Sequence, residues 1–377
     1  MIYLDNNATT RPTQDVLRAV IETLQTAWAN PSSVHGPGQA AARQVSIARK
    51  KVADLLAVNT DRVVFTSGAT EANEAVARHY LKFDANVVTS MAEHPAVVGH
   101  YLRHFPERIH RIPVDGVGRW RLDILETVLH SVMGPKLVAL AWANGETGVL
   151  QDVTAIETLA ARSDAALLID ASQAIGRIAT PAPSTAWLTL SGHKLHAPKG
   201  VGVLVEPEGA QSLVVAAGGG QEDGRRGGTL NVPGIVGLGV ACDLRHRELH
   251  RIIGQMELLR DWFEEQVTTG LSDVLVNGAA TLRVANTSNL TIFGVDGMAL
   301  VARLEGRGII CSQVSACSSG RPEPSQTLLA MGRSSAEAFS SLRFALSVDT
   351  TEQDVQAAAQ AVVEEASFLR EIMGGLV

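Results

Sequence analysis

Ser191-Gly-His-Lys-Leu-His-Ala-Pro-Lys-Gly200 is a polar turn that separates two apolar runs, residues 186–190 and 201–205. Short apolar runs bounded by Pro and Gly are typical of buried strands, so both runs are predicted to be strands of a covered sheet. Lys194 would then lie between two buried strands, where a desolvated amine is suited to form a Schiff base. A solvated lysine in a surface loop is the alternative.

The same order of strand, polar turn and helix recurs earlier in the chain. Apolar runs at 63–65, 86–89, 137–141 and 166–169 each end in a turn rich in polar and small residues. This alternation predicts crossover units, and therefore an α/β fold with a mostly parallel sheet covered by helices on both faces. Ligands of such sheets bind beyond the carboxyl ends of the strands, so these turns are expected to line one pocket.

Segments outside this alternation indicate an N-terminal arm and a second domain. The polar stretch 4–10 is expected to lie as an arm over the rest of the chain, and the part from about 271 to 377 is expected to form a smaller α+β domain. Apolar spacing predicts helices at 13–29, 40–56 and 233–270, then strands near 274–276 and 288–292 and helices near 297–306, 335–341 and 352–375.

The bulk composition argues against several classes of protein. The chain has 377 residues, a net charge of −7, 19% charged residues and no basic block of the kind that binds nucleic acid. No apolar run reaches membrane-spanning length and the N-terminus lacks a signal-peptide pattern, so a cytoplasmic location is expected. The three cysteines are too few for a disulfide framework and lack zinc-site spacing, so free thiols and no metal site are expected.

Three strand-end residues add chemistry to Lys194. Thr70 follows a small-residue turn at a predicted helix N-terminus, which suits a phosphate group or, alternatively, N-capping by Ser67 or Thr70. Asp170 ends a very apolar strand and requires a partner, either a protonated ring nitrogen or the amides of a helix N-terminus. His94 is suited to stack on a flat ring and to exchange protons, or only to bond its backbone. Together these groups specify pyridoxal phosphate.

Two further residues are candidates for the reaction itself. Cys317 lies in a stretch rich in Ser, Gly and Pro that is typical of an accessible loop, so a reactive thiol is predicted, with a small buried side chain as the alternative. Cys242 and Cys311 lie in apolar contexts and are expected to be structural. The guanidinium of Arg343 would suit a substrate carboxylate or an internal salt bridge.

In their order along the chain, these motifs resemble the pyridoxal-phosphate-dependent cysteine desulfurases of the nitrogen-fixation and iron–sulfur-assembly type. The resemblance extends nearly from end to end and rests on Tyr3-Leu-Asp-Asn-Asn-Ala-Thr-Thr10, Phe65-Thr-Ser-Gly-Ala-Thr-Glu71, Glu93-His-Pro-Ala-Val97, Trp142-Ala-Asn144, Glu146-Thr-Gly148, Ser191–Gly200, Gly224-Arg-Arg-Gly-Gly-Thr229, Ser315-Ala-Cys317, Glu323-Pro-Ser325 and Leu342-Arg-Phe344. It implies the fold-type I architecture of the class V aminotransferases. The large cofactor-binding domain, with a seven-stranded type of sheet, would span 13–255. A small domain would comprise 1–12 and 256–377.

The resemblance also implies a role for each matching residue. Lys194 would hold the cofactor and move protons, His94 would stack on its ring, and Cys317 would take the sulfur of L-cysteine as a persulfide, leaving L-alanine. The implied cofactor ligands are Ala69, Thr70, Asp170, Gln173, Ser191, His193 and, across a homodimer interface, Thr229. Arg343 and Asn144 would bind the substrate. A sulfur-acceptor or scaffold protein, serving iron–sulfur clusters or another pathway, would be the partner.

Four departures from the family's pattern bear on this interpretation. Gly145 stands where a second Asn is usual, which removes a side chain near the substrate. Val314 replaces a glycine in the cysteine loop and stiffens it. Gly220 replaces a frequent His, and the C-terminus stops soon after the last helix. Two alternative functions remain: a related lyase or aminotransferase acting on another small amino acid, and a weakened homologue kept as a partner-binding subunit.

Overall fold

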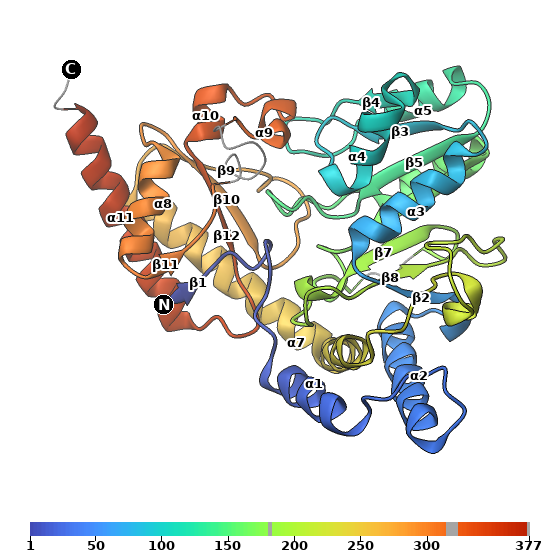
Figure 1. Cartoon of the computed structure of the whole chain (residues 1–377). Helices are drawn as coiled ribbons and strands as arrows, with labels where there is room; N and C mark the ends of the chain where they lie inside the picture. Colours follow the sequence, from blue (N-terminus) through green and yellow to red (C-terminus); the bar gives the residue numbers. More distant parts are fainter. Residues whose placement is uncertain (180–182, 314–322, 375–377) are drawn as a thin grey trace.

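The computed structural model describes residues 1–179, 183–313 and 323–374, and its main body is a seven-stranded sheet (Figure 1). The strands lie in the order β2-β8-β7-β6-β5-β3-β4. Their bounds are β2 (Val63–Thr66), β3 (Asn86–Ser90), β4 (Ile109–Ile112), β5 (Lys136–Ala141), β6 (Ala165–Asp170), β7 (Trp187–Ser191) and β8 (Gly202–Val205). From β7 to β4 every pair is parallel, whereas β8 is antiparallel to both neighbours. The connection 192–201 is too short for a parallel crossover, which needs about a dozen residues or more, so β8 reverses direction.

Helices cover both faces of this sheet because its strands are apolar on both sides. In β5, Leu137 and Ala139 join a core under α3 (Ala69–Leu81) and α4 (Pro95–His104). The alternating residues Val138 and Leu140 join the opposite core. That core is covered by α2 (Gly36–Leu56), α5 (Leu122–Ser131), α6 (Val153–Arg162) and the first half of α7 (Val232–Gly270). Each fully buried side chain of this kind contributes about 1.5–3 kcal/mol, so the two cores hold the strand ends in fixed positions.

A second, antiparallel sheet lies beside the first and has its own core. It contains β9 (Val274–Val276), β10 (Thr287–Ile292) and β12 (Ser341–Ala345), with β10 in the middle. The remaining elements of this part are α8 (Gly297–Gly306), β11 (Ile309–Ile310), α9 (Gln326–Ala330), α10 (Ser335–Phe339) and α11 (Glu352–Gly374). The apolar side chains of β10, β12, α8 and α11 form a separate buried cluster. The mostly parallel sheet and the smaller α+β part predicted from the sequence are both present.

The helix α7 runs through both parts of the molecule (Figure 1). Near its start, Leu238 packs in the core of the large sheet, whereas Phe263 near its end packs in the core of the small one. The predicted domain boundary between residues 255 and 256 falls inside this helix. The division of the chain into two domains at that point stays a prediction.

The N-terminal arm lies across the two parts, in agreement with the expectation for residues 4–10. The short strand β1 (Ile2–Tyr3) pairs with β11, and Asp5 bridges to Ala345 at the end of β12. Further on, the amide of Thr10 donates to the carbonyl of His193 (2.9 Å), and α1 (Gln14–Thr26) begins. The arm therefore joins the small sheet to the lysine turn.

None of the described helices is both long and apolar enough to cross a membrane. The described residues also contain no group of three or more His, Cys, Asp and Glu side chains arranged to hold a metal ion.

Candidate active site

Lys194 lies in a single 3-10 turn directly after β7, at the carboxyl edge of the large sheet. Its Nζ donates to the backbone carbonyls of Asn7 (2.5 Å) and Ala8 (2.9 Å) in the arm. Burial, together with the charges of Arg177 and Arg343, lowers the pKa of the amine to about 8 against the opposing effect of Asp170 and Asp5. A substantial fraction of the amine is therefore uncharged near neutral pH, which is the nucleophilic form.

Asp170 ends β6, the strand beside β7, and its carboxylate is held from two sides. One oxygen accepts from the amide of Ser172 (3.0 Å) and the other from Nδ2 of Asn73 on α3 (2.9 Å). Asn73 in turn accepts a hydrogen bond from the hydroxyl of Thr189 (2.7 Å), so its amide orientation is fixed. The bond from the Ser172 amide is the local contact expected of an N-cap residue. The bond from Asn73 joins Asp170 to a helix that is distant in sequence. Asn73 was not predicted, although it is the polar residue on an otherwise alanine-rich face of α3.

Ser191 and the first turn of α3 form a small cup of donors. Oγ of Ser191 accepts from the amide of Ala69 (2.9 Å). The helix has Gly68 at its N-cap position and no side chain caps it, so the alternative of capping by Ser67 or Thr70 is wrong. The remaining amides of this turn, together with the helix dipole, suit an anionic group.

The cup depends on a close approach of two backbones. A Cβ atom at Gly202 would lie 2.5 Å from both the Cα of Gly68 and the carbonyl oxygen of Leu190. Only glycine lets β8 approach the turn before α3 this closely. The backbones of these two segments therefore fix the position of the turn that faces Ser191.

The other predicted phosphate ligands, His193, Thr70 and Thr229, form no hydrogen bond to Ser191 or to the amide of Ala69 among the described residues. Nδ1 of His193 lies 3.1 Å from the hydroxyl of Thr9, and burial together with Lys194 and Lys199 lowers the pKa of its ring to about 4. His193 is therefore neutral at physiological pH. Thr70 and Thr229 are exposed on this chain, and their roles stay predictions.

His94 follows β3 and caps α4 by accepting a hydrogen bond from the amide of Ala96 (3.1 Å). Part of the residue is exposed to solvent, while burial of the ring lowers its pKa. The charges of Lys194 and Arg343 lower this pKa as well, and that of Asp170 opposes them. The carboxyl group of Glu93 accepts from the amides of Ala141 and His94, and burial raises its pKa to about 8.

Asn7 of the arm connects residues from every side of this space and was not predicted. Its Nδ2 donates to the carbonyl of Gly145 (3.1 Å) and to the hydroxyl of Thr287 (2.9 Å). Its side-chain oxygen accepts from Arg177 (2.7 Å), while its backbone carbonyl accepts from Gln173 (2.9 Å) as well as from Lys194. The cofactor ligand predicted at Gln173 is therefore tied to the arm.

Arg177 is a buried cation whose partners are all neutral oxygens. It donates to Asn7, to the side-chain oxygen of Gln173 and to the backbone carbonyl of Lys194 (3.2 Å). Burial lowers its pKa to about 9, and the charges of Arg245 and Arg343 act in the same direction. Arg177 follows Gln173 by four residues, and this short separation is the sequence signal that could have indicated their contact.

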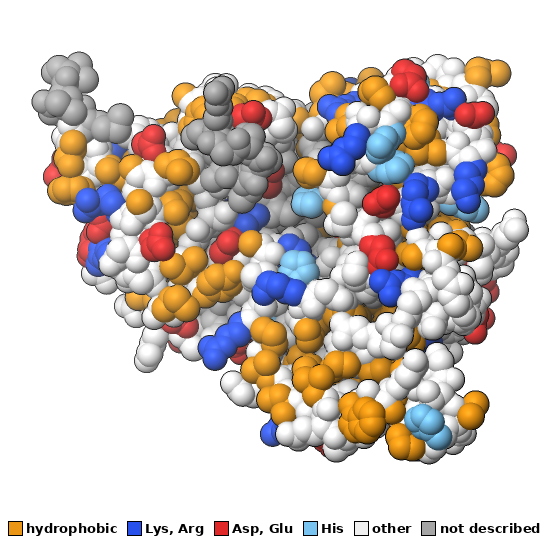
Figure 2. Space-filling view, in the orientation of Figure 1, with side chains coloured by type: hydrophobic (Ala, Val, Ile, Leu, Met, Phe, Trp, Pro, Cys, Tyr) orange, Lys and Arg blue, Asp and Glu red, His pale blue; other side chains and the backbone are white. Residues whose placement is uncertain are grey.

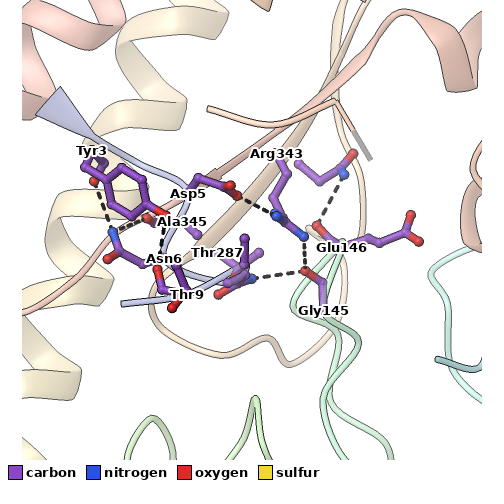
Figure 3. A network of polar contacts seen from close by, with 12 residues as sticks. Tyr3, Asp5, Asn6, Thr9, Gly145, Glu146, Thr287, Arg343 and Ala345 are labelled. Carbon is purple, nitrogen blue, oxygen red and sulfur yellow. Dashed lines mark hydrogen bonds and ion pairs between the residues drawn. The ribbon is translucent and has the colours of Figure 1, made fainter. Parts of the chain in front are cut away.

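Arg343 enters the site from β12 and is already engaged by the arm (Figure 3). One terminal nitrogen donates to Asp5 (2.6 Å) and the other to the backbone carbonyl of Gly145 (3.0 Å). Its Nε is buried and has no hydrogen-bond partner among the described residues. The internal salt bridge foreseen as an alternative is present, and the free Nε–H leaves one donor for a carboxylate.

Asn144 shapes the turn that carries Gly145. Its side-chain oxygen accepts from the amides of Glu146 and Thr147, and its nitrogen donates to Ala92 (3.3 Å). A Cβ at Gly145 would lie 3.5 Å from Nε2 of Gln173, an ordinary packing distance, so a side chain fits here against Gln173. Substrate binding by Asn144 stays a prediction.

Of the three cysteines, Cys242 and Cys311 are buried free thiols, as expected for structural residues. Burial raises the pKa of each to about 12. Cys317 and Val314 lie outside the described residues.

Charged and histidine side chains gather at the hollow between the two lobes of the molecule (Figure 2). The strand-end lysine, the supported carboxylate and the donor cup lie on the large sheet, and an arginine faces them from the small sheet. This combination defines an enzyme site of the fold-type I class.

The comparisons with known proteins agree with this classification. The family Aminotransferase class-V matches residues 2–358. A cysteine desulfurase of Cereibacter sphaeroides is 39% identical over 363 residues, covering 94% of this chain and 92% of the relative. A NifS-like protein from Rickettsia africae has a structure with a TM-score of 0.88 at 30% identity, covering 97% of this chain and 99% of that one. The structure of SspA in complex with cysteine has a TM-score of 0.77 at 26% identity, covering 93% and 100%.

The chain therefore belongs to the aminotransferase class-V family, an enzyme family, and within it to the NifS-like cysteine desulfurases. Members of this family depend in general on pyridoxal phosphate.

Proposed function

We propose that this chain is an L-cysteine desulfurase that uses pyridoxal phosphate and transfers the sulfur to Cys317. The observation that carries the proposal is that Asp170 and Lys194 lie at the carboxyl ends of the neighbouring strands β6 and β7, while Lys194 and Arg343 are both bonded to the arm. The structures and sequences that this chain resembles include cysteine desulfurases and a protein in complex with cysteine.

The residues present fit the cofactor. Lys194 would bind it covalently, the cup of Ser191 and Ala69 would hold its phosphate, and Asp170 would pair with its ring nitrogen. The support from Asn73 keeps the carboxylate of Asp170 in place without neutralising it. The cofactor supplies an electron sink that makes the Cβ–S bond of cysteine labile.

The protein groups account for the remaining steps. Arg343 would orient the substrate carboxylate, with its Nε–H as the free donor. Lys194, with a pKa of about 8, is suited to accept and return a proton close to neutral pH. The thiolate of Cys317 attacks the substrate sulfur: the Cβ–S bond breaks, an S–S bond forms on Cys317, and the carbon takes a proton to give alanine. No external oxidant is needed, because the sulfur is transferred as a persulfide.

A homodimer with shared sites is part of the same proposal. The helices α1 and α2 carry exposed apolar side chains, such as Ile21 (55% exposed) and Ile47 (52% exposed), and the connection between them adds Trp28 and Val34. Figure 2 shows hydrophobic side chains spread over this part of the molecule, where Figure 1 places α1 and α2. Such patches mark interfaces, and a second copy would bring Thr229 to the cofactor of its partner. A cytoplasmic location and a separate sulfur-acceptor protein also belong to the proposal.

The test compares wild type with Cys317→Ser in the presence of L-cysteine and a reductant. We expect wild type to produce alanine and sulfide in equal amounts, and the variant to produce neither while it keeps the visible absorbance of the bound cofactor. Cys242→Ser, which changes a buried thiol in α7, is the control for loss of a cysteine as such. If Cys317→Ser matches wild type, sulfur is not transferred to Cys317 and a lyase reaction is the better description. If Lys194→Ala keeps the visible band, the cofactor assignment is wrong.

A further inference from the structure

A second cavity, of about 240 Å³, lies between the start of α1, the middle of α7 and the turn after β12. It is separate from the cup of Ser191 and is lined by Thr13, Leu195, His196, Arg245, Arg251 and Asp349, among others. Leu195 and His196 directly follow Lys194 in the chain, so this cavity lies behind the lysine turn. Neither the family resemblance nor the proposed reaction uses it.

Arg245 is the unusual residue of this cavity. It is 5% exposed, yet within the described residues it forms no hydrogen bond and no ion pair, and its Nη1 is buried without a partner. Its stem packs close to Gly176, where a Cβ would lie 3.3 Å from Cγ of Arg245. Burial lowers the pKa of the guanidinium to about 10. An unpaired buried cation is costly, and buried guanidinium groups are normally satisfied by oxygen atoms.

His196 supplies a second unpartnered atom. Its Nδ1 lies 2.6 Å from the carbonyl oxygen of Arg11, so Nδ1 must carry the hydrogen of that bond. The other nitrogen, Nε2, is buried and has no hydrogen-bond partner in the part of the chain that the structure describes. Burial and the charge of Arg245 lower the pKa of the ring to about 3, so Nε2 is an acceptor at neutral pH. The residue has a left-handed backbone (φ +69°), which the hydroxyl of Thr10 supports by accepting from its amide (2.7 Å).

The other charges around the cavity are mostly paired with one another. Asp15 is bound to Arg18, and Glu248 is bound to Arg251. Asp349 raises the pKa of Arg245 through its charge but forms no ion pair with it. The pair of unsatisfied groups is therefore one cationic fork and one neutral acceptor.

We propose that this cavity binds hydrogen phosphate through Arg245 and His196. Two phosphate oxygens accept from the guanidinium fork, and the P–OH group donates to Nε2 of His196. Sulfate has the same shape but no hydroxyl at neutral pH, and a phosphomonoester, whose second pKa is about 6, has mostly lost its own. Of these three anions, hydrogen phosphate is thus the one that satisfies both atoms. This inference does not rest on the proposed function.

Calorimetric titration of the cofactor-loaded enzyme with inorganic phosphate in chloride buffer tests the proposal, because the loaded cofactor occupies the cup of Ser191. We expect saturable binding of phosphate and about tenfold or more weaker binding of sulfate and of glycerol 3-phosphate. Arg245→Gln should weaken phosphate binding by about tenfold or more. Arg247→Gln is the matched control, since this arginine lies on the same helix but is exposed and bound to Asp243, and it should leave phosphate binding unchanged.

Two more variants keep the test decisive if Arg245→Gln folds poorly. Asp349→Asn removes a carboxylate that competes with the anion for Arg245, so phosphate should bind more tightly. His196→Asn tolerates the left-handed backbone but brings an amide donor, so the preference for phosphate over sulfate should disappear. Absence of phosphate binding, equal binding by Arg245→Gln and wild type, or weaker binding by Asp349→Asn would each overturn the proposal.

Discussion

The two walls of the lysine pocket are built in different ways. The strand-end wall, which consists of Lys194, Asp170, Ser191 and His94, follows the large sheet, and each residue comes directly after or at the end of a strand. The arm wall, which consists of Asp5, Asn7 and Arg343, joins segments from opposite ends of the chain. The first wall is positioned by a rigid core and the second by a network of hydrogen bonds. We therefore expect changes in the first to act mainly on chemistry, and changes in the second on stability and substrate affinity.

Asp170→Asn should have the largest effect on activity, because it removes the charge that the ring nitrogen requires and leaves one acceptor oxygen for the two donors, Ser172 and Asn73. We expect turnover of cysteine to fall roughly a hundred- to a thousandfold, the scale of losing one preorganised electrostatic contact. Alanine production measures this effect. Asp164→Asn, at the opposite end of β6, is the control and should retain activity. Near-normal turnover by Asp170→Asn would show that the strand-end wall does not control the chemistry.

Asn7→Ala tests whether the arm wall acts chiefly on stability. The change removes the side-chain bonds to Gly145 and Thr287 and leaves the buried Arg177 without one of its acceptors. We expect the free energy of unfolding to fall by about 2–4 kcal/mol, measured by urea denaturation of the apoprotein. Asn30→Ala, at an exposed turn, should change it little. An unfolding midpoint unchanged in Asn7→Ala would contradict the assignment.

Arg177 joins the two walls, because it donates to both Asn7 and the backbone carbonyl of Lys194, and Arg177→Gln tests this connection. The uncharged amine is the form that captures pyridoxal phosphate, and its fraction grows as the pH rises through the pKa of Lys194, which is about 8. Removing the positive charge of Arg177 raises this pKa, so the midpoint of cofactor capture by the apoprotein should move to higher pH. Arg177→Lys retains the charge and should keep the midpoint near that of wild type. A shift to lower pH would refute the electrostatic coupling.

Asp5→Asn should have the smallest effect, confined to substrate affinity. Asp5 competes with an incoming carboxylate for Arg343, so its neutralisation should lower the KM for cysteine by up to about fivefold with little change in kcat. Steady-state kinetics measures the KM and kcat of Asp5→Asn. The control is Asp15→Asn, which removes a carboxylate that pairs with the exposed Arg18 instead. A raised KM would mean instead that Asp5 positions Arg343 for the substrate.

The same comparison explains which features could be predicted from the sequence. The strand-end wall follows from hydrophobic runs and from the rule that ligands bind at the carboxyl ends of parallel strands, so the sequence could place Lys194, Asp170 and His94 at one edge of the sheet. Asn7 and Arg177 were missed because their contacts depend on packing between distant segments, which leaves no local pattern. Four strands were also missed, and two of them, β1 and β11, have only two residues each. The sequence of β4, Ile-His-Arg-Ile, is polar because it lies at the edge of the sheet, and β12 is a short run beside a predicted helix.

The arm has a consequence for the order of assembly during synthesis. Asp5 bonds to Arg343 across a separation of 338 residues, and Asn6 bonds to Ala345 across 339. The arm is therefore synthesised long before the segment that contains β12. Contacts this distant in sequence form late because the intervening chain must already be ordered. The large sheet is therefore expected to fold around the lysine turn while the pocket is still open on one side, and the pocket is closed only when synthesis has reached β12 and this strand meets the arm.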